Sequence, residues 1–117
     1  MQKAKIKPDQ LVIEGIVLPL NLESLKHFHS DMGMYLPSIE RHTIVSFWMG
    51  FIWALRIGKN PFTDLISQHV QHRYRFKCYA TGWPNQIERL AEKLNKNWVD
   101  TYLQVSAEVL SQIDSTK

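Results

Sequence analysis

The stretch Ile44–Leu55, IVSFWMGFIWAL, decides the fold, because it carries no charged residue and is apolar on every side of a helix. A helix without a polar face must be covered by other protein or by lipid. Such a segment reaches only about 18 Å, whereas the hydrocarbon core of a membrane is about 30 Å thick. The sequence therefore predicts a buried, aromatic-rich helix at the centre of the fold and no membrane span.

A stripe of small residues runs along this helix, since Ser46, Gly50 and Ala54 recur at every fourth position. Small side chains allow another backbone to approach closely. Two interpretations follow: close packing inside one chain, which we favour, or contact with the same helix of a second copy or with the terminal helix of a partner subunit.

The rest of the chain predicts one mainly helical (α+β) domain over residues 1–117, with residues 1–9 as a flexible polar leader. Apolar periodicity and turn residues indicate helices over 22–34, 39–57, 61–72 and 84–113, the third beginning at Asn60-Pro61. A β-branched run at 11–18 indicates a short strand. We expect a four-helix core around the aromatic-rich central helix, with a minor two-stranded pairing of 11–18 and 73–79.

Within residues 72–78, cationic and apolar side chains alternate strictly from Arg73 to Cys78. A strand would place Arg73, Arg75 and Lys77 on one face, whereas an extended third helix would continue the stripe of Ile66 and Val70 through residue 74. We favour the strand, because such a run of period-two alternation seldom arises by chance.

The positive charge is concentrated in one part of the chain. The formal net charge is +3, and the excess lies in residues 56–83, where Asp64 is the only acidic residue. Such a patch favours a polyanionic partner. Nucleic acid is one such partner, with phosphates on the basic strand face and bases stacked on aromatic rings, and an acidic protein surface is the other. The predicted contact residues are Arg73, Arg75, Lys77, Tyr79 and Trp83. A solvated strand face without a partner is the plainer alternative.

The predicted terminal helix, 84–113, would be about 45 Å long and would extend beyond its own core. Its apolar stripe continues to the end, and an exposed apolar stripe is typical of an interface. We therefore expect a homodimer. The predicted self-association residues are Trp98, Tyr102, Val105, Val109 and Ile113.

Catalytic and metal motifs are weak. His27 and His29 point in different directions on a helix, and His69 and His72 with Cys78 would give only a conceivable ligand set for a metal. The sequence has no nucleophile elbow, phosphate loop or paired-carboxylate motif. We therefore expect no enzyme, no cofactor and no bound metal.

The single cysteine and the absence of an apolar secretion signal favour the cytoplasm. The leading hypothesis is a small accessory or regulatory protein that self-associates and binds a macromolecular partner through its basic face. Direct nucleic-acid binding is the first alternative, and a small metal-dependent or hydrolytic enzyme is the second.

Overall fold

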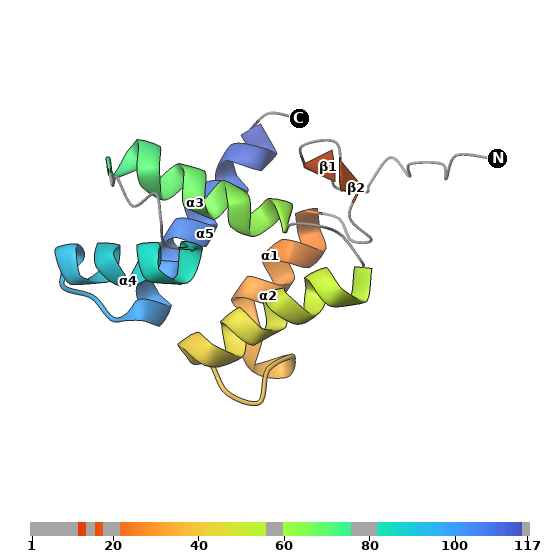
Figure 1. Cartoon of the computed structure of the whole chain (residues 1–117). Coiled ribbons are helices and arrows are strands. Elements are labelled where there is room, and N and C mark those ends of the chain that lie inside the picture. The colour runs from red at the N-terminus through yellow and green to blue at the C-terminus, as the bar shows by residue number, and fades with distance from the viewer. Residues whose placement is uncertain (1–11, 14–15, 18–21, 56–59, 76–81, 116–117) are drawn as a thin grey trace.

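The computed structural model describes residues 12–13, 16–17, 22–55, 60–75 and 82–115. Helices dominate these ranges, which confirms the predicted mainly helical fold. The predicted leader at 1–9 lies outside the described residues. In chain order the elements in Figure 1 are β1 (Val12–Ile13), β2 (Ile16–Val17), α1 (Leu22–Ser30), the 3₁₀ helix η1 (Met32–Met34), α2 (Arg41–Leu55), α3 (Pro61–Arg73), α4 (Trp83–Leu94) and α5 (Trp98–Ser115).

The two short strands pair with each other. They run antiparallel, with Val12 opposite Val17 and Ile13 opposite Ile16. The predicted pairing of 11–18 with 73–79 is therefore wrong for the described residues, because the partner of β1 is only two residues away in sequence. Closing the short loop of a local hairpin costs less conformational entropy than closing a loop of about sixty residues. Residue 73 belongs to α3, as in the alternative interpretation, and residues 76–79 lie outside the described residues.

Three helices form the centre of the molecule. α3, α4 and α5 contact one another, α1 packs on α5, and Figure 1 shows α1 and α2 beside this group. The side chains that fill the space between them are almost completely buried: Phe62, Ile66 and Val70 from α3, Ile87 and Leu90 from α4, and Tyr102, Val105 and Val109 from α5.

The start of α3 follows the sequence signal closely. The Asn60 side-chain oxygen accepts hydrogen bonds from the backbone N–H groups of Phe62, at 3.0 Å, and of Thr63, at 3.2 Å. Pro61 occupies the first turn, where its missing N–H costs nothing. This cap satisfies two backbone N–H groups of the first turn of α3, which have no partner within the helix.

The predicted single helix over 84–113 is wrong, because the chain breaks between α4 and α5. Asn95 adopts a left-handed conformation, with φ 55° and ψ 47°. The Lys96 N–H donates to the Ala91 carbonyl at 2.9 Å and closes α4, and the Asn97 side chain accepts from the Asp100 N–H at 2.7 Å and caps α5. The two halves then pack against each other instead of forming a long rod.

α2 lies at the edge of the helical group. Ile44 and Trp48 are buried, and Phe47 stacks on Phe28 of α1 with ring centroids 4.4 Å apart. On the other side, Met49 is 53% exposed and Trp53 is 80% exposed. The prediction that other helices enclose this helix on all sides is therefore wrong. Within the described ranges, one face of α2 is covered and the other is exposed.

The small-residue stripe belongs to the open side. A Cβ atom added at Gly50 would meet no heavy atom of the described residues within 4 Å, apart from its own stretch of helix. The favoured interpretation, close packing inside one chain, is therefore wrong for Gly50. We use the term "outer face of α2" for five exposed residues on this side: Ser46, Met49, Gly50, Trp53 and Ala54.

Candidate functional site

The predicted basic contact residues do not form one described surface. Arg73 ends α3, with its guanidinium 5.6 Å from the centre of the Tyr74 ring. Arg75 is exposed and has a positive φ of 58°. Lys77 and Tyr79 lie outside the described residues. The strand interpretation is thus wrong at Arg73, which is helical.

Trp83, the predicted stacking residue, is half-buried at the start of α4. Its ring centroid lies 5.9 Å from that of Trp98 and 5.8 Å from that of Tyr102. The ring therefore already packs against two aromatic side chains of α5. Nucleic-acid binding through this segment stays a prediction, with less support from Trp83.

The predicted self-association residues are used inside the chain. Tyr102, Val105 and Val109 are buried, while Trp98 and Ile113 are half-buried and pack against the core. The break at Asn95 accounts for this, because it folds the apolar stripe of α5 onto α3 and α4. A second subunit is not needed to cover the stripe, so the homodimer prediction loses the argument that led to it.

A buried hydrogen-bond chain joins three helices near these residues. The Trp48 indole N–H donates to the Tyr102 hydroxyl at 2.8 Å, and the Tyr102 hydroxyl lies 2.9 Å from His29 Nε2. His29 Nδ1 lies 2.8 Å from the Leu25 carbonyl, which can only accept, so Nδ1 carries the proton and Nε2 accepts from Tyr102. Burial lowers the pKa of His29 below its ordinary value of 6.5 and raises the pKa of Tyr102. Both pKa directions favour this neutral arrangement.

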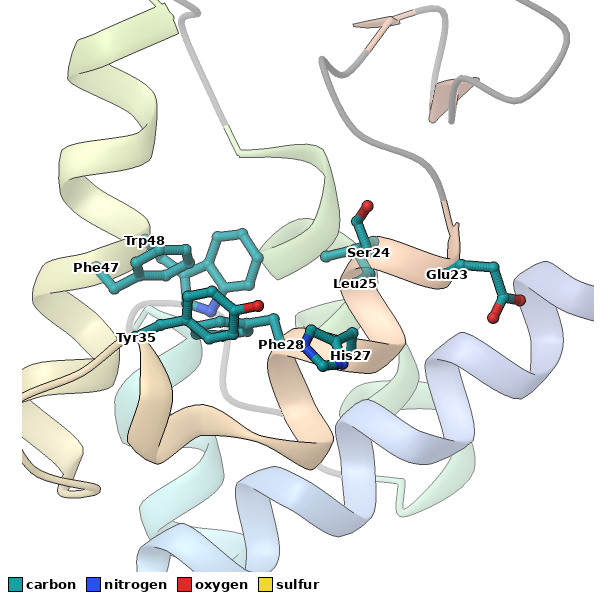
Figure 2. Close-up of a pocket in the computed structure, with 8 residues that line it drawn as sticks. All are labelled: Glu23, Ser24, Leu25, His27, Phe28, Tyr35, Phe47 and Trp48. Atoms are coloured by element: carbon teal, nitrogen blue, oxygen red, sulfur yellow. The ribbon is translucent and has the colours of Figure 1, made fainter.

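An aromatic pocket of ≈ 470 Å³ lies between α1 and α2. Figure 2 shows the rings of Phe28, Tyr35, Phe47 and Trp48 gathered at one end, with Glu23 farther along α1. A pocket of this size and character suits an apolar or flat group.

A polar network links α3 with α5 on another side of the core. His69 Nε2 lies 2.8 Å from Glu108 Oε1, and the Tyr74 hydroxyl donates to both Glu108 oxygens, at 2.9 and 3.0 Å. Gln104 donates to the Tyr74 hydroxyl at 2.9 Å, and Gln104 in turn accepts from the Lys96 ammonium group. Partial burial and the bond to Glu108 raise the pKa of Tyr74, so its hydroxyl remains a donor.

A cavity of ≈ 340 Å³, which we call the His69 pocket, opens beside this network. Its described lining consists of Leu65, Gln68, His69, His72, Arg73 and Gln112. The sequence pattern singles out His69 and His72 because they lie three positions apart. It gives no sign of Glu108, which is 39 positions away from His69. Only the packing of α3 on α5 brings these groups together.

The described residues contain no group of three or more His, Cys, Asp or Glu side chains that could hold a metal ion. Cys78, part of the conceivable ligand set, lies outside the ranges that the structure describes. Among the helices described, none combines the length and apolar character that crossing a membrane requires. Comparison of the chain with known protein families, with curated proteins and with solved structures found no significant match.

Proposed function

We propose that this chain is a non-catalytic binding protein that acts through protein–protein contacts, and that the outer face of α2 associates with the same face of a second copy. The observation that carries the proposal is Trp53, which is 80% exposed on a helix without a charged residue from position 43 to position 55. A tryptophan in water leaves roughly 200 Å² of largely apolar surface uncovered.

The composition of this face is that of an interface. Tryptophan and methionine are enriched at the centres of protein interfaces, where charged residues are depleted. Met49 and Trp53 lie one helical turn apart on the outer face of α2. A helix that only faced water would carry charged side chains at such positions.

A second copy suits this face better than a charged partner does. The outer face has no charge with which to pair an acidic or basic surface, and two identical uncharged faces avoid burying an unpaired charge. Ser46, Gly50 and Ala54, which are small, lie beside the larger Met49 and Trp53 on this face. A two-fold axis between two copies would place the large side chains of each copy over the small residues of the other.

The expected association is weak. Five residues form the outer face, whereas a standard interface uses roughly 20–30 residues from each partner. We therefore expect a dimer that dissociates on dilution rather than an obligate one. Contact of a further macromolecule with the basic segment remains a prediction, supported by the exposure of Arg73 and Arg75.

Sedimentation velocity from about 10 μM to about 1 mM protein tests the proposal. We expect the weight-average mass to rise with concentration toward twice the monomer mass. Met49→Glu should abolish this rise, because it places a charge in the uncharged face. Met34→Glu is the matched control, since Met34 is 73% exposed and lies in η1, outside that face.

Circular dichroism should show that both variants keep their helical content, because both side chains are exposed. A monomer at every concentration would contradict the proposal, and so would an equal loss of association in the Met49 and Met34 variants.

A further inference from the structure

We propose that the aromatic pocket between α1 and α2 binds a small aromatic amine, whose flat ring lies among the aromatic side chains and whose ammonium group lies beside the Glu23 carboxylate. The volume of ≈ 470 Å³ falls within the range of about 300–1,000 Å³ that is typical of small-molecule sites. None of the described lining residues belongs to the outer face of α2. Binding of an amine and self-association are therefore independent, and either one can fail without the other.

A fixed aromatic wall forms one end of the pocket. Phe28 of α1 stacks on Phe47 of α2, with ring centroids 4.4 Å apart (Figure 2). Trp48 meets Phe28 and Phe47 edge-to-face, with centroids 6.0 and 4.9 Å apart. Phe28 and Trp48 are buried, so the core holds their rings in place. Aromatic rings favour stacked and edge-to-face contacts with one another, which makes a flat ring the apolar group that suits this wall.

The hydrogen bond of Trp48 also limits which part of a ligand suits this end. The Trp48 indole N–H donates to the Tyr102 hydroxyl at 2.8 Å, inside the core. Because this N–H is the only donor of the indole, and phenylalanine has none, Phe28, Phe47 and Trp48 offer only apolar atoms and ring faces to the pocket. A polar group placed against these three rings would lose its hydrogen bonds with water. The ring of the ligand therefore belongs at this end and its charged group at the other.

Tyr35 supplies the movable side of the pocket. It directly follows η1 and is 51% exposed, and its ring centroid lies 5.9 Å from that of Phe28. Figure 2 shows the Tyr35 ring beside those of Phe47 and Trp48. Exposed side chains change rotamer within nanoseconds, so Tyr35 gives a ligand access without disturbing the buried rings. In its observed position the Tyr35 ring adds a further aromatic contact for a bound ligand.

The charge of the lining favours a cation over an anion. Glu23 carries a carboxylate, and none of the described lining residues is a lysine or an arginine. Lys26 lies 3.8 Å from Glu23 Oε1, but it is not a lining residue, and a carboxylate accepts more than one hydrogen bond. The His27 ring, which also lines the pocket, has the Asp31 carboxylate 3.2 Å from its Nδ1. These carboxylates repel an anionic ligand, whereas the faces of the aromatic rings attract an ammonium group within about 6 Å.

The two ends of the pocket contribute unequally to the expected affinity. The Glu23 side chain is 83% exposed, so water and salt weaken its attraction for an ammonium group. An exposed ion pair changes an affinity only about two- to fivefold. The ring contacts therefore supply most of the affinity, and Glu23 supplies the preference for a cation.

Titration with phenethylamine, followed by NMR of the backbone amides and aromatic side chains, tests the proposal. The amino group of this probe stays protonated at neutral pH, as that of lysine does. We expect a Kd of about 1–10 mM, which is ordinary for a ligand of this size, and signal changes at Phe28, Tyr35 and Phe47. Phenethyl alcohol has the same ring without the charge and should bind about two- to fivefold more weakly. Phenylacetate, an anion, should bind more weakly still.

Matched variants separate the contributions of the charge and the ring. Glu23→Gln should reduce the affinity for phenethylamine to that for phenethyl alcohol, whereas Glu92→Gln should change neither, because Glu92 is an exposed residue of α4 outside the pocket. Tyr35→Ala should weaken the binding of all three probes, and Tyr35→Phe, which keeps the ring, should not. Met34→Ala is the control for Tyr35→Ala, since Met34 is 73% exposed in η1 and does not line the pocket. All these side chains are exposed, so circular dichroism should show unchanged helical content.

Three results would overturn the proposal: no signal change at the three rings, equal weakening by the Glu23 and Glu92 substitutions, or tighter binding of phenylacetate than of phenethylamine. Signal changes at the same rings when the protein is concentrated without any probe would overturn it in favour of a second copy as the occupant of the pocket.

Discussion

Hydrogen bonds to one buried side chain, Tyr102, connect α1 and α2 with α5. The Tyr102 hydroxyl accepts from Trp48 of α2 and donates to His29 of α1, so one atom of α5 serves both helices. Burying a polar group without a partner costs about 1–3 kcal/mol. Here the Trp48 N–H, the Tyr102 hydroxyl and the His29 ring are hydrogen-bonded to one another. This arrangement forms only when α1, α2 and α5 are packed together.

His29 makes the stability of the fold depend on pH. Its pKa lies below 6.5 in the folded protein because burial disfavours the charged ring. As the pH falls through 6.5, the unfolded chain binds a proton at this position before the folded chain does. The free energy of unfolding therefore decreases as the pH falls below 6.5, until the folded pKa is reached.

Urea unfolding at about pH 7.5 and about pH 5.5 measures this effect. We expect the natural protein to lose more stability between the two pH values than His29→Gln does. The comparison with the variant removes the contribution of the other histidines, which are present in both proteins. An equal loss would mean that His29 is accessible to protons in the folded state.

At the scale of the helices, Asn95 determines how the C-terminal third folds. Its left-handed backbone costs roughly 1–2 kcal/mol for most residues, and asparagine and glycine tolerate it best. We expect Asn95→Ala to lower the free energy of unfolding by about 1 kcal/mol and Asn95→Gly to leave it nearly unchanged. Denaturant titration measures both.

This pair of variants also distinguishes two structures. In an uninterrupted helix over 84–113, Asn95→Ala would stabilise the protein, because alanine has the highest helix propensity, and Asn95→Gly would destabilise it. The opposite order is expected for a break at Asn95.

The elements that the sequence predicted well depend on local chemistry. Asn60 and Pro61 mark the start of α3 because the cap involves only the next two backbone N–H groups. The sequence did not predict the break at Asn95, because the apolar periodicity continues across it. The apolar residues of α4 and α5 therefore form one continuous stripe in the sequence. Periodicity shows which face of a helix is apolar, but not where two such faces fold onto each other.

The candidate sites were less predictable than the helices. The His69 pocket requires Glu108 and Gln112, which approach only after α3 packs on α5. The lack of charge on α2 predicted that other helices would enclose it. Among the described residues, cover is found on the side of Ile44 and Trp48, and the sequence pattern could not show which side that would be.

The whole molecule has two surfaces of opposite character. The outer face of α2 is uncharged, whereas the His69 pocket is lined by basic and amide side chains. An uncharged face recognises a partner by shape and apolar contact, and it depends little on salt. Self-association through the outer face of α2 should therefore change little with ionic strength.

Substitutions at Gly50 distinguish an effect on the stability of one chain from an effect on its association with a second copy. Because a Cβ atom at this position would meet no heavy atom of the other described residues, Gly50→Ala should stabilise the monomer by roughly 0.5–1 kcal/mol through the lower flexibility of the unfolded state. Gly50→Leu should also leave the melting temperature of dilute protein unchanged or higher. In concentrated protein, however, the leucine side chain would occupy the position that the proposed dimer leaves for Met49 and Trp53 of the second copy, and it should abolish the rise in mass seen by sedimentation. A lower melting temperature for Gly50→Leu in dilute solution would show instead that the chain covers its own small-residue stripe.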